Sequence, residues 1–131
     1  MIEVKPVQEK EEQAKLCALG GVAYDADLLM YAAYVDEQLV ACCQFGMPKA
    51  VGLVADLFAV VPRSAAVEEA LFIMGRAALN FIDLCGVHEA YTPAPKAEDE
   101  LLMRKIGFKQ TEDNKWYMNL EGFFATPCSH H

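Results

Sequence analysis

The sequence has few basic residues. Its 131 residues include 11 Lys and Arg against 19 Asp and Glu, a formal net charge of -8. A surface with this charge repels phosphate-rich polymers at long range, so we expect no nucleic-acid partner. The acidity favours neutral or cationic partners, although acidic residues that only keep a protein in solution would give the same balance.

The sequence also lacks a long apolar run, a leader segment and a disulfide pattern. No apolar stretch reaches the roughly 18 residues that a membrane span requires, and Met1 to Lys5 lack the basic and apolar character of a secretory leader. The five cysteines form an odd number without repeated spacing, which does not indicate a disulfide framework. We therefore expect a cytoplasmic protein that does not contact the membrane.

What the sequence does contain is enough apolar material for one folded domain. Hydrophobic residues make up 54% of the chain, which is incompatible with disorder, and the length suits a single domain. We expect this domain to span residues 1–124, followed by a flexible tail over residues 125–131. Cys128, His130 and His131 in that tail are too few for a specific zinc site, and we expect no metal site.

The hydrophobic periodicity predicts a mixed α/β (α+β) domain built around one sheet. The chain begins with a segment of alternating apolar and polar residues, followed by a charged helical segment and a hairpin of two apolar runs. A third apolar run comes next, and a long amphipathic segment follows it. The expected strands are 1–7, 28–35, 39–47, 51–61, 87–91, 108–111 and 116–120, and the expected helices are 8–19, 66–85 and 96–106.

The third apolar run contains one polar residue, Asp56. Residues 51–61 read V-G-L-V-A-D-L-F-A-V-V, a pattern typical of a central strand covered on both faces. A carboxylate in apolar surroundings has a raised pKa, which suits a general base. A structural hydrogen bond to a loop would explain Asp56 equally well.

Three segments of the C-terminal half carry a family resemblance. They read D-L-F-A-V-V-P over residues 56–62, L-L-M-R-K-I-G-F over 101–108 and W-Y-M-N-L over 116–120, with a long helix between the first two. In this order they resemble the GCN5-related N-acetyltransferase (GNAT) family. The resemblance implies a twisted, mostly antiparallel sheet flanked by helices, which opens between the strand that contains Asp56 and the strand at residues 87–91.

The resemblance also implies a ligand and roles for particular residues. Acetyl-CoA would lie in the opening of the sheet, and the acyl acceptor would be a small-molecule or peptide amine. Asp56 would act as the general base. The family's acid, a tyrosine that reprotonates the departing thiolate, is replaced here by Met103, so the role would fall to Tyr91 or, less favourably, to Tyr117, unless these tyrosines only pack in the sheet. The backbone of Phe58, Ala59 and Val60 would hold the pantetheine arm, and the phosphates would bind at Arg63, Ser64, Ala65, Ala66 and Val67.

The phosphate loop departs from the family pattern. Residues 62–71 read P-R-S-A-A-V-E-E-A-L, without the glycines that let phosphate approach the backbone, and Glu68 brings a negative charge into the loop. Met103 stands where the family often has its tyrosine. Two hypotheses therefore stay open: an acyl-CoA-dependent N-acetyltransferase, and a catalytically inactive module of the same fold that binds a ligand or dimerises. The C-terminal aromatic residues would suit a homodimer contact or the protein's own core.

Overall fold

A computed structural model describes residues 1–124 of the chain, so the expectation of a flexible tail over 125–131 lies outside the described residues. One seven-stranded sheet has the strand order β1-β2-β3-β4-β5-β7-β6, and every neighbouring pair is antiparallel except β4 and β5. The strands are β1 (Ile2–Pro6), β2 (Leu29–Val35), β3 (Gln38–Gly46), β4 (Gly52–Ala59), β5 (Glu89–Thr92), β6 (Lys109–Gln110) and β7 (Trp116–Asn119). The helices are α1 (Lys10–Gly20), α2 (Ala65–Leu84) and α3 (Glu100–Ile106), with short 3-10 turns η1 (Pro48–Ala50) and η2 (Ala97–Asp99).

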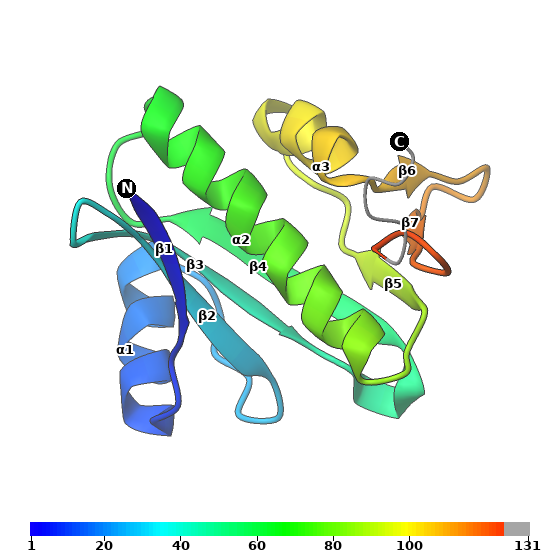
Figure 1. Cartoon of the computed structure of the whole chain (residues 1–131), viewed down its shortest axis with the longest axis horizontal. Coiled ribbons are helices and arrows are strands. Elements are labelled where there is room, and N and C mark those ends of the chain that lie inside the picture. Colours follow the sequence, from blue (N-terminus) through cyan, green and yellow to red (C-terminus); the bar gives the residue numbers. More distant parts are fainter. Residues whose placement is uncertain (125–131) are drawn as a thin grey trace.

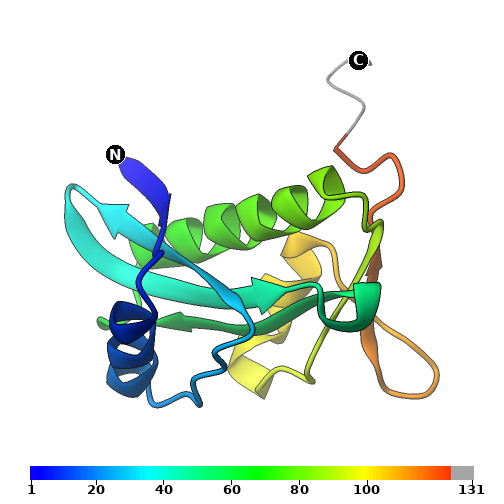
Figure 2. The same cartoon turned by 90° about the horizontal axis from the view of Figure 1, so that it is seen from below.

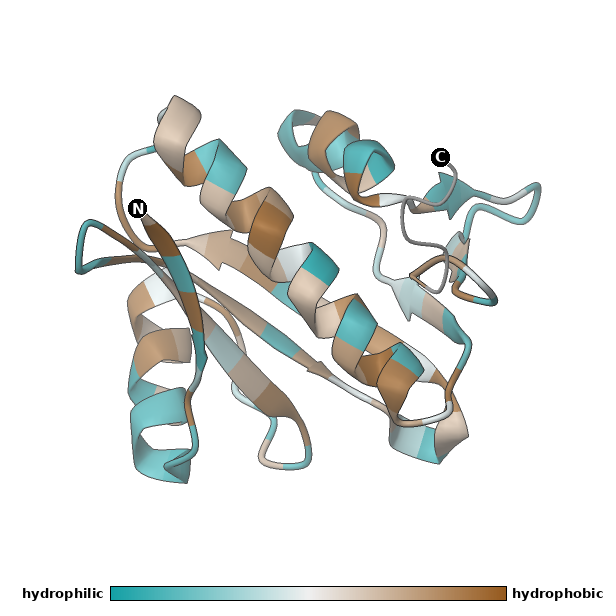
Figure 3. Cartoon of the chain, viewed as in Figure 1, coloured by the Kyte–Doolittle hydropathy of each residue, from teal (hydrophilic) through white to brown (hydrophobic). Residues whose placement is uncertain are grey.

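The helices cover the two faces of the sheet unequally. The long helix α2 lies across one face of strands β2 to β4, and α1 packs on the other face beside β2 and β3 (Figures 1 and 2). The hydropathy colouring shows why α1 covers less: its first turns are hydrophilic, whereas hydrophobic residues run along the length of α2 (Figure 3). The face that carries α1 therefore leaves part of β4 open.

The two faces form two separate hydrophobic clusters. The adjacent residues Cys42 and Cys43 show the division, because successive side chains of a strand point to opposite faces. Cys42 is buried with Cys17 of α1, whereas Cys43 is buried in the larger cluster under α2. Both cysteines therefore pack in the core, on opposite faces of the sheet.

The long helix α2 begins and ends one residue before the predicted bounds of 66–85. Ser64 is the N-cap, and its Oγ accepts the backbone N–H of Val67 at 3.3 Å. Its buried face comprises Val67, Ala70, Leu71, Met74, Gly75, Ala78, Leu79 and Ile82. On the opposite side of α2, Arg76 Nε donates to the carbonyl of Ile106 at 2.6 Å, which ties α3 to α2.

Strands β4 and β5 are in register at only two positions. Gly52 pairs with Ala90 and Leu53 with Tyr91, and beyond them the two strands diverge. A Cβ at Gly52 would lie 2.6 Å from the Glu89 carbonyl oxygen, so glycine is required where the strands come closest. The expected opening of the sheet is therefore present.

Two sequence expectations need correction. The apolar pattern of residues 51–61 predicts burial on both faces, but β4 is only partly buried from Ala55 onward because its neighbour β5 has diverged. The segment predicted as one helix over 96–106 is divided into the 3-10 turn η2 and the short helix α3. No helix within residues 1–124 combines the length and the apolar character needed to cross a membrane.

We predict that truncation of Met74 strongly destabilises the protein. Met74 lies under α2 with 0% exposure, so Met74→Ala leaves a cavity and should lower the free energy of unfolding by about 2 to 5 kcal/mol. The neighbouring Ile73, 37% exposed, is the matched control, and Ile73→Ala should cost about 1 kcal/mol or less. Urea denaturation of both variants tests this, and equal losses would contradict the assignment of the core face.

A prediction about pH dependence concerns the pair formed by His88 and Asp83. His88 Nδ1 lies 2.6 Å from Asp83 Oδ1, and this hydrogen bond raises the pKa of His88 above its ordinary value of 6.5. Because the folded state holds the proton more tightly, the stabilisation is complete below pH 6.5 and is lost as the pH rises through the raised pKa. An NMR titration should show a raised midpoint for His88 that Asp83→Asn returns toward 6.5; an unchanged midpoint would contradict the pairing.

Candidate functional site

A cleft of about 470 Å³ follows the open edge of β4. It begins at the end of α1, passes along β4 and reaches the N-terminal side of α2 and the loop after β5. Its lining comprises Gly20–Val22, Ala55–Ala59, Val61–Arg63, Thr92–Lys96, Glu98, Asp99, Leu102 and Met103. The cleft therefore lies where β5 has separated from β4.

Asp56 lies in this cleft at an irregularity of the sheet. Gln44 of β3 is its partner in register, but the next residue, Phe45, pairs with Val54, so β4 contains one extra residue at this point. Partial burial raises the pKa of Asp56, and a hydrogen bond from Gln44 counteracts part of that rise. An ionisable group with a raised pKa in a cleft is a candidate for proton transfer.

Gln44 is a site residue that the sequence analysis did not identify. It is 2% exposed, and its Nε2 donates to Asp56 Oδ2 at 2.8 Å and to the carbonyl of Ala23 at 3.0 Å. Its Oε1 accepts the backbone N–H of Asp25 at 2.8 Å. The sequence contains one sign of its role, because Gln44 interrupts an apolar run just as Asp56 does. That pattern does not indicate which loop groups Gln44 bonds to.

The segment expected to hold a pantetheine arm is only partly in the cleft. Phe58 and Ala59 line it, whereas Val60 does not, and the Val60 N–H is donated to the carbonyl of Val40 at 2.8 Å. The Phe58 ring packs so closely on the end of α1 that a Cβ at Gly20 would overlap it. Phe58 and Gly20 together therefore shape the wall of the cleft beside α1.

At the α2 end of the cleft, an ion-pair network surrounds Arg63. The guanidinium bonds to Glu68 through Nε and to Asp99 through Nη2, the latter at 3.1 Å. The bond from Arg63 lowers the pKa of Glu68, so the carboxylate stays charged. The only described cation of the α2 N-terminal loop is thus already shared between two carboxylates.

Of the residues expected at the phosphate site, only Arg63 lines the cleft. Ser64, Ala65, Ala66 and Val67 form the cap and first turn of α2 outside the lining. The Val67 N–H is taken by the Ser64 side chain. The structure thus brings Asp56, Phe58, Ala59 and Arg63 into one cleft and leaves the other residues of the predicted phosphate loop beside it.

Tyr91, the expected acid, lies next to the cleft without lining it. Its ring is 5.0 Å, centroid to centroid, from that of Tyr117 on β7. The following residue, Thr92, does line the cleft, and its Oγ1 donates to the Val54 carbonyl at 2.8 Å. This bond bridges the two strands just where their backbone pairing ends.

The remaining wall of the cleft combines prolines and apolar side chains with the charged residues Lys96, Glu98 and Asp99. Pro93 and Pro95 line it after Thr92, and Leu102 and Met103 of α3 complete it. Within residues 1–124 no group of three or more His, Cys, Asp or Glu side chains is arranged to hold a metal ion. The site accordingly offers a cleft of mixed polar and apolar lining, with a carboxylate at the α1 end and a paired guanidinium at the α2 end.

Comparison with known proteins identifies the fold. No protein-family model matches the sequence, and no curated protein matches it. Among solved structures, the PaiA N-acetyltransferase of Thermoplasma acidophilum in complex with coenzyme A is similar to this chain, with a TM-score of 0.68 and 12% sequence identity. The match covers 91% of this chain and 99% of the PaiA chain. A Bacillus subtilis acetyltransferase in complex with CoA has a TM-score of 0.67 and 12% identity, covering 92% and 99%.

A third similar structure is the ribosomal-protein-S18-alanine N-acetyltransferase of Escherichia coli, with a TM-score of 0.64, 10% identity and coverage of 92% of this chain and 94% of that one. These likenesses extend over nearly the whole length of both chains in each comparison. They confirm the fold predicted from the sequence: the chain has the fold of the GCN5-related N-acetyltransferases.

Proposed function

We propose that the protein transfers an acyl group, acetyl in the simplest case, from an acyl-CoA thioester to an amine. The observation that carries this proposal is the cleft itself, in which a half-buried carboxylate stands at one end of an open β-strand edge. A thioester whose arm lies along that edge would have its acyl group near Asp56. The solved acetyltransferases of similar fold support the same chemistry by analogy.

The two halves of acetyl-CoA fit the cleft unequally. The apolar side chains of the lining and the open edge of β4 suit a narrow pantetheine arm, with Phe58 and Ala59 beside it. The diphosphate would lie beside Arg63, whose guanidinium already forms ion pairs with Glu68 and Asp99. The helix dipole of α2 attracts phosphate by only about 0.3 to 1 kcal/mol, so these two carboxylates weaken the anchoring of the phosphates.

Proton transfer in this proposal falls to Asp56. Attack of a neutral amine on the thioester carbonyl forms the C–N bond and breaks the C–S bond, and the sulfur leaves with the bonding electron pair. Asp56 takes the proton from the attacking nitrogen, for which its raised pKa makes it a stronger base. Tyr91, beside the cleft, is our candidate for returning a proton to the thiolate.

A second candidate function rests on the ion pairs of Arg63. If Glu68 and Asp99 hold the guanidinium permanently, Arg63 is not free to bind a diphosphate, and Lys96 is the remaining cation among the described residues that line the cleft. The fold would then serve as a binding or dimerisation module without acyl transfer. Its cleft would accept a ligand that lacks phosphate.

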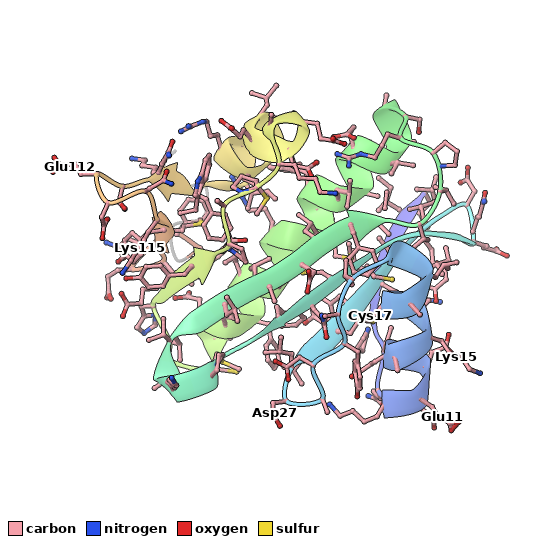
Figure 4. The ribbon with its side chains drawn as sticks, turned by 180° about the vertical axis from the view of Figure 1, so that it is seen from behind. Glu11, Lys15, Cys17, Asp27, Glu112 and Lys115 are labelled. Atoms are coloured by element: carbon pink, nitrogen blue, oxygen red, sulfur yellow. The ribbon has the colours of Figure 1, made fainter. Side chains whose placement is uncertain are left out.

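The first prediction concerns the proposed base. Asp56→Asn should lower the rate of acetyl transfer about 10²- to 10⁴-fold while leaving acetyl-CoA binding intact, because the amide cannot accept the proton. Release of free CoA thiol, measured with a panel of polyamines, aminoglycosides and lysine peptides, gives the rate. Glu112→Gln, in the exposed β6–β7 turn (Figure 4), is the matched charge control. Equal activity of both variants would exclude Asp56 as the base.

The second prediction concerns the Arg63 network. Glu68→Gln should free Arg63 for phosphate and tighten CoA binding about two- to fivefold, the value of one partly exposed charge interaction. Arg63→Met should weaken it. Titration calorimetry at low and moderate salt measures both, and pantetheine, which has no phosphate, is the control ligand whose affinity neither substitution should change.

The same titration separates the two candidate functions. Binding of acetyl-CoA that weakens on Arg63→Met supports the acyltransferase and excludes the module without phosphate recognition. Absence of heat with acetyl-CoA and CoA at sub-millimolar concentration, together with binding of pantetheine, would favour the second candidate.

A further inference from the structure

The side chain of Gln44 is fixed by three hydrogen bonds that leave its amide a single orientation. Its oxygen must face the N–H of Asp25, because an N–H cannot bond to another donor. The NH₂ group therefore points the other way, and one of its two hydrogens goes to the Ala23 carbonyl. The second hydrogen is directed at Asp56 Oδ2, 2.8 Å from Nε2.

The burial of Gln44 makes this arrangement costly to break. At 2% exposure, an unmatched amide hydrogen would lose about 1 to 3 kcal/mol of hydration without replacement. The Gln44 amide therefore cannot rotate without losing hydrogen bonds, and its N–H stays directed at the Asp56 carboxylate. Among the described residues, Asp56 Oδ1 has no hydrogen-bond partner, and Asp56 lines the cleft.

We propose that Gln44 is a positioning residue for Asp56: backbone groups of residues 23 and 25 orient its amide, and its N–H fixes the carboxylate with Oδ1 available to the acceptor amine. This inference rests on the proposed function, in which Asp56 takes the proton. It gives the loop between α1 and β2 a part in the reaction, because that loop sets the orientation of the carboxylate through Gln44.

The other charged and titratable groups around Asp56 do not duplicate this role. Cys17 of α1 and Cys43 of β3 interact electrostatically with Asp56, but burial raises the pKa of both thiols, which therefore stay neutral. Asp25 of the loop contributes its backbone N–H to Gln44. Arg63, across the cleft, bonds to Glu68 and Asp99 instead. Within the described residues, Gln44 is the sole hydrogen-bond donor to the Asp56 side chain.

The test measures the pKa of Asp56 by carboxyl NMR in three proteins. Gln44→Met keeps the approximate volume and removes the N–H, so the midpoint for Asp56 should rise by about one pH unit. Gln44→Glu, with an acceptor in place of the donor, should raise it further, because two carboxyl groups then face each other. If transfer activity is present, the acid limb of the kcat/KM profile should move by the same amount.

A second buried glutamine provides the matched control. Gln13 is 3% exposed, and its Nε2 donates to the Val7 carbonyl at 2.7 Å, between α1 and the end of β1. Gln13→Met removes a comparable buried amide without touching the Gln44 network. It should destabilise the fold to a similar extent and leave the midpoint for Asp56 unchanged. A shift in Gln13→Met as large as that in Gln44→Met would overturn the inference.

A measurement on the unmodified protein keeps the inference testable if Gln44 variants do not fold. The side-chain amide protons of Gln44 should shift with the midpoint of the Asp56 titration and exchange slowly with solvent. Amide protons that are insensitive to that titration would refute the positioning role.

These outcomes are separable from those of the proposed function. The coupling between Gln44 and Asp56 is observed without any acyl donor or acceptor. Coupling without acetyl transfer would mean that the proposed reaction fails although the geometry is correct. Transfer whose pH profile is unchanged by Gln44→Met would mean that the reaction stands and the positioning role does not.

Discussion

The parting of β4 from β5 is the constraint on which the rest of the structure depends. The two strands are parallel neighbours for two residues, held closely at Gly52, and then separate. A strand that loses a neighbour exposes backbone groups and side chains that a central strand would bury. The cleft, the partial burial of β4 and the accessibility of Asp56 all follow from that separation.

The two ends of the cleft are electrostatically different. At the α1 end, partial burial raises the pKa of Asp56, and the hydrogen bond from Gln44 offsets only part of that rise. At the α2 end, opposite charges are matched, with Arg63 between Glu68 and Asp99. The distribution of charge in the cleft therefore says more about its chemistry than the net charge of the chain does. The Asp56 carboxylate, where proton transfer is proposed, forms no ion pair within the described residues.

The sequence predicts the elements and the fold because each element has a local signal. Helix α2 has its cap at Ser64 and a regular apolar face, and the hairpin between β2 and β3 has polar residues at its turn. The resemblance of three short segments predicts a mostly antiparallel sheet that opens between β4 and β5, as the structure has it. Asp56 stood out as a lone carboxylate in an apolar run.

The partners of the site residues could not be predicted in the same way, because they are distant in sequence. Asp99 is 36 positions from Arg63, and the loop groups that hold Gln44 are 19 and 21 positions away from it. Hydrogen bonds of this kind depend on how elements pack in three dimensions. Periodicity, which reports which face of an element is buried, contains no information about them.

The prolines in the wall opposite β4 make the cleft chemically one-sided. Pro93 and Pro95 have carbonyl oxygens but no N–H, so this stretch of the lining offers mainly acceptors. A ligand that spans the cleft would find no backbone donor at the two prolines and would meet donors elsewhere, at Lys96 and along β4. Such a channel distinguishes the two edges of an amide-containing chain, and so fixes which way round the chain lies.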